Sequence, residues 1–260
     1  MTHLVAPLVL RTDDDRGVTT LTLNRPAAFN ALSEELLTAL QNELNDLAKS
    51  QKLRVLVIAA AGKAFCAGHD LREMRAEPSM DYYQKLFAQC GQMMMSIQKL
   101  QVPVIAKVQG IATAAGCQLV AQCDLAVASS EAKFAVSGVN LGLFCSTPSV
   151  ALSRNLSRKA AFEMLVTGDF LSAPEALSQG LINKIAEPSE LDAAIEVLVS
   201  KILSKPSVAL AMGKELFYMQ LETGIEKAYD YATQTMACNM MDNSALEGVQ
   251  AFIEKRKPNW

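Results

Sequence analysis

The chain has 260 residues and a formal charge of −3, and half of its residues are hydrophobic. This composition excludes a disordered or fibrous protein, because the chain holds enough apolar side chains to bury a large core. A slightly acidic chain also gives no electrostatic reason to expect a nucleic-acid partner. We therefore expect a globular protein that binds neither nucleic acid nor a membrane.

Cysteine and histidine usage bears on metals and on the cellular compartment. The chain has six cysteines without a C-x-x-C pair, and its only histidines are His3 and His69. That set is too small and scattered for a typical zinc site. Cysteines in apolar stretches suit a reducing compartment, and an N-terminus with three consecutive aspartates is unlike an organelle presequence. These features predict a cytoplasmic protein without a bound metal.

Strand-like and helix-like segments alternate through the first half of the chain. A helix capped by Ser33 is expected to run to about Lys49, and a second helix is expected over about residues 79–100. Runs rich in apolar and β-branched residues predict strands at 18–23, 54–60, 102–108, 125–128 and 134–136. The run 54–60 is apolar throughout, which is typical of a strand buried on both faces. Alternation at this spacing predicts an α/β fold with largely parallel sheets.

The pattern changes after about Pro148, where the chain becomes almost wholly helical. The segments Ser172–Glu175 and Ser244–Glu247 both match the capping box of a helix N-terminus. Helices at about 206–222 and 224–241 are rich in Met and Leu and carry more apolar surface than one helical layer buries. We place a core domain at residues 1–196 and a C-terminal helical region at 197–260.

Two strand ends carry turns of small residues. Residues 62–71 (GKAFCAGHDL) follow the strand 54–60, and residues 108–118 (VQGIATAAGCQ) follow the next long strand. Gly68 permits a tight turn, and small residues let a ligand approach backbone N–H groups. Two such donors can stabilise a negatively charged oxygen. Turns of this kind also serve simple tight packing, so their spacing alone leaves both interpretations open.

With these turns the chain resembles the crotonase superfamily, the enoyl-CoA hydratase/isomerase family. The resemblance implies a spiral of β-β-α turns, a helical C-terminal trimerisation region, and a CoA thioester as the ligand with no separate cofactor. It is carried by short motifs in the same order along nearly the whole chain: Asn24-Arg-Pro, Phe29-Asn-Ala-Leu32, Ala64-Phe-Cys-Ala-Gly-His-Asp-Leu71, Pro103-Val-Ile-Ala, Ala115-Gly-Cys, Cys123-Asp124, Thr167-Gly168, Ala173-Pro-Glu-Ala176, Gly180-Leu181 and Glu254-Lys-Arg-Lys-Pro258.

The resemblance also assigns roles to individual residues. The backbone N–H groups of His69 and Ala115 would hold the thioester oxygen. We expect the His69 imidazole to turn away and hydrogen-bond locally, with acid–base work as the alternative. The expected partners are an acyl-CoA or enoyl-CoA thioester and further copies of the chain, as a trimer or a dimer of trimers. The substrate-binding residues would be Ala28, Asn30, Ala64, Ala67, Gly68, Asp70, Leu71 and Gly116.

The two catalytic glutamates of the family's hydratases are replaced by Gln118 and Gly138. An amide cannot exchange a proton near neutral pH, and glycine would leave a gap, so slow hydration is expected. Candidate replacements are Asn140, Cys145 and Ser146, although Cys145 also suits the core and Ser146 suits a helix cap. Three functions remain open: an enoyl-CoA hydratase, an enzyme of other thioester chemistry (isomerisation, decarboxylation or hydrolysis), and a non-catalytic acyl-CoA-binding protein.

Overall fold

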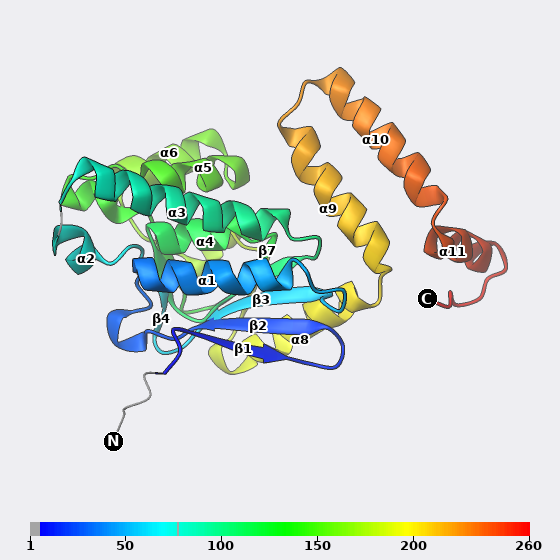
Figure 1. Cartoon of the computed structure of the whole chain (residues 1–260), viewed down its shortest axis with the longest axis horizontal. Helices are drawn as coiled ribbons and strands as arrows, with labels where there is room; N and C mark the ends of the chain where they lie inside the picture. The colour runs from blue at the N-terminus through cyan, green and yellow to red at the C-terminus, as the bar shows by residue number, and fades with distance from the viewer. Residues whose placement is uncertain (1–5, 77) are drawn as a thin grey trace.

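Two β-sheets form the centre of the computed structural model, which describes residues 6–76 and 78–260 (Figure 1). The larger sheet has the strand order β1-β2-β3-β5-β7-β10, in which β1 is antiparallel to β2 and the other pairs are parallel. Its strands are β1 (Val9–Asp13), β2 (Val18–Leu23), β3 (Val55–Ala60), β5 (Val104–Val108), β7 (Leu125–Ser129) and β10 (Lys184–Ala186).

The smaller sheet has the order β4-β6-β8-β9 and is parallel except for the pair β8–β9. Its strands are β4 (Ala64–Cys66), β6 (Ile111–Thr113), β8 (Lys133–Ala135) and β9 (Leu171–Ser172). From β3 to β8 the chain repeatedly places one strand in the larger sheet and the next in the smaller sheet, and helices separate the first two such pairs from the pair that follows. This arrangement is the β-β-α spiral that the family resemblance implies.

Helices cover these sheets and continue into a separate C-terminal arm (Figure 1). The α-helices are α1 (Glu34–Leu47), α2 (Leu71–Ala76), α3 (Met80–Lys99), α4 (Ala115–Gln122), α5 (Ser146–Asn155), α6 (Arg158–Thr167), α7 (Ala173–Ser178), α8 (Leu191–Leu203), α9 (Ser207–Leu221), α10 (Ile225–Met240) and α11 (Asn243–Ile253). Short 3-10 helices lie at η1 (Pro26–Ala28), η2 (Ser137–Leu141) and η3 (Pro188–Glu190).

The central strand β3 explains how one sheet supports two cores. Its alternate side chains point to opposite faces: Leu56 and Ile58 join the main core, whereas Val55 and Val57 pack against α8 in a second core. The continuous apolar run therefore reflects burial on both faces, as predicted. The main core includes five leucines of α1, which lie on its buried face: Leu36, Leu37, Leu40, Leu44 and Leu47.

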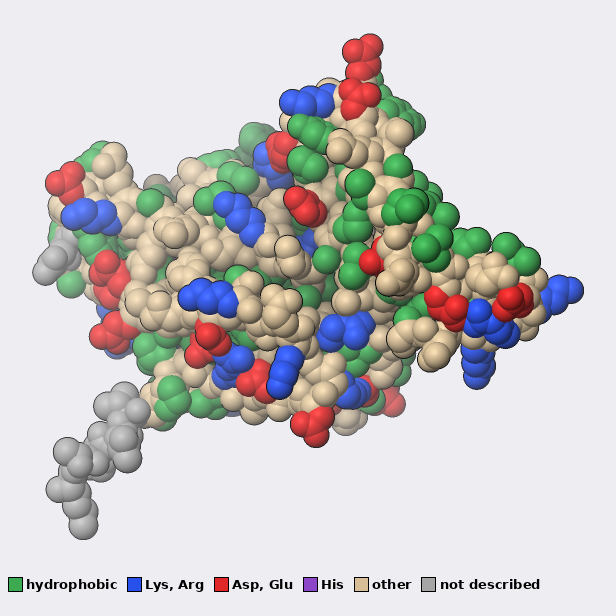
Figure 2. Space-filling view, turned by 45° about the vertical axis from the view of Figure 1, so that its right-hand side comes forward, with side chains coloured by type: hydrophobic (Ala, Val, Ile, Leu, Met, Phe, Trp, Pro, Cys, Tyr) green, Lys and Arg blue, Asp and Glu red, His purple; other side chains and the backbone are tan. Residues whose placement is uncertain are grey.

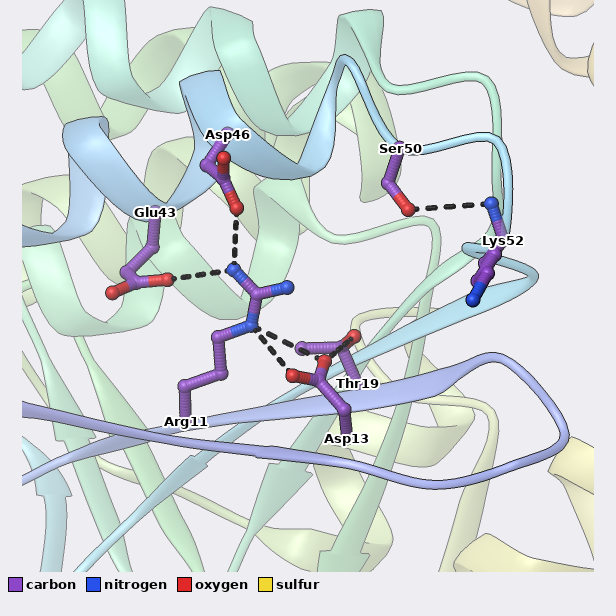
Figure 3. Close-up of polar contacts among 7 residues, drawn as sticks. All are labelled: Arg11, Asp13, Thr19, Glu43, Asp46, Ser50 and Lys52. Carbon is purple, nitrogen blue, oxygen red and sulfur yellow. Dashed lines mark hydrogen bonds and ion pairs between the residues drawn. The ribbon is translucent and has the colours of Figure 1, made fainter.

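A polar cluster joins the edge strand β1 to α1 (Figure 3). Arg11 of β1 donates hydrogen bonds to Glu43 and Asp46 on α1, at 3.2 and 2.7 Å, and also contacts Asp13 on its own strand. Thr19 of β2 donates to the same Asp13. The cluster fixes the antiparallel edge of the sheet, which the sequence did not predict, against the first helix.

Helix capping follows the sequence at one of the two predicted boxes. At Ser172 the box is complete, because its side chain accepts from the backbone of Glu175 and the Glu175 carboxylate accepts from the backbone N–H of Ser172. The box at Ser244 is wrong. There Asp242 is the N-cap of α11 and accepts from the Ser244 N–H, while Glu247 instead pairs with Arg256.

The chain after Pro148 differs from expectation in two details. It is mostly helical as expected, but it also contributes two short strands: β9 pairs with β8 in the smaller sheet, and β10 pairs with β7 in the larger sheet. The division at residue 196/197 falls inside α8, a helix that packs on the larger sheet. The change from body to arm comes after α8, at the start of α9.

The arm is fastened to the body by a buried polar cluster. Lys214 of α9 forms an ion pair with Asp124 at 2.7 Å, and it also donates to the carbonyl oxygens of Ile97 and Val102. The Tyr218 hydroxyl donates to the other oxygen of Asp124 at 2.7 Å. Burial lowers the pKa of Lys214 and raises that of Tyr218, while Asp124 supports the charged form of the lysine. A helix without a fully buried residue is thus held by its polar side chains.

The arm exposes a large share of its apolar side chains. Figure 2 shows hydrophobic side chains gathered along it, beyond the edge of the body. Large exposed apolar residues on α9, α10 and α11 and in the turn between α10 and α11 include Phe217, Leu221, Ile225, Tyr229, Met236, Met241, Phe252 and Ile253. None of the helices in the described part of the chain is long and apolar enough to span a membrane.

Candidate active site

An apolar cavity of about 330 Å³ lies where the smaller sheet meets α3, α4 and α5. Five of the predicted site residues line it: His69, Ala115, Gly138, Cys145 and Ser146. Ala67 and Leu71 of the predicted substrate path also line it. Residues that the sequence did not single out complete the wall: Met74, Phe87, Thr113, Ala114, Ser137, Leu141, Leu143, Phe144, Thr147 and Pro148.

One signal in the sequence could have identified part of this wall. Leu141, Leu143 and Phe144 lie close together shortly after Gly138, in a segment without a charged residue. The structure leaves each of these side chains exposed. Large apolar residues left exposed together often mark a binding surface. Phe87 and Met74 carried no such signal, because their approach to the cavity depends on how α2 and α3 pack.

The two predicted oxyanion donors are brought together by the smaller sheet. β4 and β6 are parallel neighbours, and the Thr113 hydroxyl donates to the Ala67 carbonyl at 3.0 Å across their ends. Gly68 has a φ of +91°, and a Cβ atom there would lie 2.9 Å from the Cβ of Ala114. Glycine is therefore required at the turn, since only it permits this approach of the two segments.

Neither of the two N–H groups is hydrogen-bonded within the described part of the chain. Around His69, the N–H of Leu32 donates to the Gly68 carbonyl and the N–H of Asp70 donates to the Leu32 carbonyl. Within residues 6–76 and 78–260, the N–H groups of His69 and Ala115 have no acceptor. Both residues line the cavity, so two backbone donors are available to a ligand oxygen.

The peptide that carries the Ala115 N–H is held in a strained conformation. Ala114, the N-cap of α4, has φ +49° and ψ −120°, a region that residues with a Cβ rarely adopt. Its own N–H donates to the Ala135 carbonyl at 2.9 Å, which fixes the strand before it. Strain of this kind costs about 1–3 kcal/mol and is common at functional sites. Ala115 is the first residue of α4, where the helix leaves its N–H groups unpaired.

The His69 side chain differs from the prediction. It makes no local hydrogen bond: neither ring nitrogen has a partner in the described parts of the chain, and Nε2 is shielded from solvent. The ring instead packs edge-to-face on Phe87, with centroids 5.3 Å apart. Burial lowers the pKa of His69 to about 4, so the imidazole is neutral at pH 7. His3, the other histidine, lies outside the described residues.

Of the two positions where the family's hydratases carry glutamate, only Gly138 borders the cavity, whereas Gln118 does not. Gln118 is buried in α4 and is not part of the cavity wall, and its Oε1 has no hydrogen-bond partner in the described residues. Gly138 does line the cavity, but the expected gap is absent. A Cβ atom there would lie 2.3 Å from the Leu143 carbonyl oxygen and 2.7 Å from the Cys145 Sγ. This crowding, and not a positive φ, restricts position 138 to glycine.

The candidate nucleophiles are present but not activated. Cys145 belongs to the core and also borders the cavity, and burial raises the pKa of its thiol. Ser146 begins α5 without capping it by its side chain; its hydroxyl lies 3.4 Å from the Phe144 carbonyl. Neither residue is hydrogen-bonded to His69. Asn140 is not part of the cavity wall; its side chain lies close to Gly168.

The other predicted substrate-binding residues support the loops around the site. The side chain of Asn30 is fully buried and hydrogen-bonded to the backbone. Its oxygen accepts from the Arg25 N–H, and its amide nitrogen donates to the carbonyl oxygens of Ala61 and Ala64. Asp70 pairs with Arg25 at 3.0 Å and accepts from two N–H groups at the start of α2. Burial opposes ionisation of Asp70, but these hydrogen bonds lower its pKa.

Close packing accounts for Gly116, and Ala28 lies in η1, outside the cavity wall. A Cβ atom at Gly116 would lie 2.1 Å from the carbonyl oxygen of Cys66. Glycine therefore lets α4 approach β4 closely. In the described part of the chain, no group of three or more His, Cys, Asp or Glu side chains is arranged to hold a metal ion.

Comparison with known proteins identifies the family. The model of the enoyl-CoA hydratase/isomerase family matches residues 13–260. The chain belongs to this family. It is 44% identical over 254 residues to the mouse protein "Enoyl-CoA hydratase domain-containing protein 3, mitochondrial", covering 98% of this chain and 85% of the relative. It is 31% identical to the crotonyl-CoA hydratase of Syntrophomonas wolfei, covering 95% and 96% of the two chains.

The fold agrees equally well with solved structures. A crystal structure of an enoyl-CoA hydratase from Mycobacterium smegmatis matches with a TM-score of 0.97 and 66% identity, covering 98% of this chain and 99% of that one. From the sequence, residues 114–119 and 138–148 resemble domain-containing protein 3. The comparison confirms a likeness to that protein over nearly the whole chain. The chain therefore has the crotonase fold.

The comparisons contradict the prediction of a cytoplasmic location. The mouse, rat and human relatives are all named as mitochondrial proteins. Reduced cysteines and an acidic start were too indirect to decide the compartment. A reducing environment is not unique to the cytoplasm, so free cysteines in the core do not distinguish one reducing compartment from another.

Proposed function

We propose that the cavity binds the acyl group of a CoA thioester, with the carbonyl oxygen accepting hydrogen bonds from the backbone N–H groups of His69 and Ala115. The observation that carries this proposal is the pair of acceptor-free donors at the border of one apolar cavity. Pockets of this size and polarity suit small apolar groups. Names of family members that act on enoyl-CoA substrates, such as the S. wolfei crotonyl-CoA hydratase, support the same ligand class.

The reaction that fits best is of the enoyl-CoA hydratase type, at a reduced rate. Two oxyanion donors stabilise an enolate, and removal of one such donor costs about 10²–10³-fold in other enzymes. General acid–base groups give a further factor of about 10²–10⁴. Gln118 cannot exchange a proton and Gly138 has no side chain, so this second contribution is largely missing. We expect thioester polarisation without efficient proton transfer and propose no separate cofactor.

A non-catalytic acyl-CoA-binding protein is the second candidate. It is favoured by the absence of Asp, Glu, Lys and Arg from the described wall of the cavity. Isomerase, decarboxylase or hydrolase chemistry through Cys145 or Ser146 has less support. The thiol has a raised pKa, and neither residue contacts a base.

A ligand-binding experiment tests the proposal. Crotonyl-CoA affinity is measured for the unmodified protein and for Ala115→Pro, which deletes one N–H at a helix position that tolerates proline. We expect the variant to fold with an unchanged circular dichroism spectrum and to bind about 10-fold or more weakly, because the donor is lost. In a crystal structure of the complex, the thioester oxygen should lie about 2.7–3.1 Å from both nitrogen atoms. Binding elsewhere would refute the assignment.

The assembly that we propose is a trimer or a dimer of trimers built through the C-terminal arm. The arm's exposed apolar side chains, such as Phe217, Ile225 and Phe252, support this, since monomers rarely leave so much apolar surface to water. Static light scattering at micromolar concentration should give three or six times the chain mass of 28.1 kDa. A mass near that of one chain would contradict it.

A further inference from the structure

Helix α4 connects the cavity to the attachment point of the C-terminal arm. Its first residue, Ala115, carries one of the two backbone donors, and its C-cap, Cys123, is followed directly by Asp124. Asp124 is the body's half of the polar cluster that fastens the arm through Lys214 and Tyr218. The eight residues of α4 span about 12 Å at a helical rise of about 1.5 Å each. One short helix therefore separates the two features.

Close packing makes α4 a rigid element. Every residue of the helix except Gln122 is buried. Near its start, a Cβ atom at Gly116 would lie 2.1 Å from the Cys66 carbonyl oxygen, so no side chain separates α4 from β4. At its end, the side-chain amide of Asn155 donates to the Ala121 carbonyl at 2.9 Å. Closely packed segments transmit a displacement instead of absorbing it, so a movement at one end of α4 reaches the other.

The arm is the part of the structure that can detach from this helix. α9 contains no buried residue, and α10 and α11 contain one each. Segments with so few buried contacts open at a low free-energy cost. Between the described residues of arm and body there are two ion pairs. Arg154–Glu222 is exposed, at 55% and 61% of the two side chains, whereas Lys214–Asp124 is exposed at only 8% and 14%. The buried pair therefore controls whether α9 lies against the body.

Release of the arm changes the surroundings of Asp124. Its carboxylate accepts from the Lys214 ammonium, the Tyr218 hydroxyl and the Val104 N–H, each at 2.7 Å. Two of these donors belong to α9. Without them the carboxylate must move toward water or draw water in, because an unpaired buried charge is costly. That change occurs directly after the C-cap of α4. At the other end, Ala114 has a strained φ of +49°, which persists only while its surroundings hold it.

We propose that the cluster of Asp124, Lys214 and Tyr218 positions the Ala115 oxyanion donor through α4, so that docking of the arm and binding of a thioester favour each other. The inference rests on the proposed acyl-CoA site and adds a regulatory link from the arm to that site. With the arm docked, the Ala115 N–H lies at the cavity; with the arm released, α4 relaxes and the donor is displaced. Such coupling is reciprocal, so a bound thioester stabilises the docked arm by the same factor.

The test uses Tyr218→Phe, which removes one donor to Asp124 and retains the aromatic ring. Isothermal titration measures the affinities for crotonyl-CoA and for CoA itself, which has no thioester oxygen for the Ala115 donor to hold. Crotonyl-CoA should bind about 5-fold or more weakly to the variant than to the unmodified protein. CoA affinity should change by less than about 2-fold. A purely structural role of Tyr218 would weaken both ligands alike.

Arg154→Gln is the matched control, because it removes the exposed ion pair between arm and body and leaves Asp124 untouched. Both affinities should stay within about 2-fold of those of the unmodified protein, since exposed ion pairs contribute little. All three proteins are compared at a concentration where static light scattering gives the same mass, because assembly also affects the arm.

Hydrogen exchange on the unmodified protein measures the reverse effect. Saturating crotonyl-CoA should slow amide exchange in α9 about 5-fold or more, although no residue of α9 lines the cavity. Unchanged crotonyl-CoA affinity in Tyr218→Phe, an equal loss of CoA affinity, or unchanged exchange in α9 would overturn the inference and leave the acyl-CoA site intact. If Tyr218→Phe does not fold, the exchange measurement decides the question. If crotonyl-CoA does not bind the unmodified protein, the proposed function itself fails.

Discussion

Protonation of His69 opposes folding, and this gives the protein a predictable loss of stability in mild acid. Burial lowers the pKa of His69 from 6.5 to about 4. As the pH falls through 6.5, the unfolded chain takes up a proton on this residue and the folded chain does not. The free energy of unfolding should therefore fall by about 1.4 kcal/mol for each pH unit between these two values.

The size of the effect follows from the same two pKa values. At about pH 5 the loss should reach about 2 kcal/mol, and it should level off near 3 kcal/mol below pH 4. Urea unfolding of the unmodified protein and of His69→Gln, each at about pH 7.5 and pH 5, isolates this contribution. The two proteins share every other ionisable group, so the effects of those groups cancel in the comparison. Protein concentration must be equal, because assembly contributes to stability.

We expect the unmodified protein to lose about 2 kcal/mol more than His69→Gln between the two pH values. An equal loss in both proteins would refute the reasoning, since it would mean that the imidazole is solvated or paired in solution.

Four further predictions concern the site and the arm. The unmodified protein should hydrate crotonyl-CoA far below about 10 s⁻¹, a typical enzyme turnover, and Gln118→Glu alone should help little because catalytic groups act as a unit; ordinary turnover in a spectrophotometric assay would show that another residue acts as the acid or base. Gly138→Ala should lower the free energy of unfolding by about 1–3 kcal/mol through overpacking, and thermal denaturation that shows a variant as stable as the unmodified protein would contradict this. The same crowding means that Gly138→Glu, alone or with Gln118→Glu, should not restore activity unless the loop is rebuilt. Ala114→Gly should raise stability by about 1 kcal/mol by relieving the positive φ, measured by urea unfolding, and an unchanged or lower value would argue against strain. Lys214→Met should cost about 3–5 kcal/mol by leaving Asp124 buried without its ion pair, and a change below about 1 kcal/mol in the same measurement would show that the pair is solvated.

Part of the fold follows from local sequence. The β3 segment is apolar at every position, so its burial on both faces could be predicted without knowledge of what packs there. Serine before a helical pattern marked the start of α1, where Ser33 caps as expected. Ser79 caps α3 in the same way, although the sequence predicted only the range of that helix. By contrast, β10 is a three-residue strand of half-buried residues without a distinct pattern. Its conformation is imposed by pairing with β7, which only the folded chain provides.

The sequence by itself determined the family and the spiral of strands and helices, and it singled out the two turns that carry the predicted backbone donors. These depend on motifs of a few adjacent residues whose conformation is local, such as the turn at Gly68. Tertiary structure alone decided three properties of the site: the unpaired state of the His69 imidazole, the withdrawal of Gln118 from the cavity wall, and the closed space at Gly138. Each depends on contacts between segments far apart in the chain or on how a loop returns on itself, as when Leu143 and Cys145 close over Gly138. A sequence specifies which groups are present, whereas their burial, partners and charge are set by what the fold packs against them.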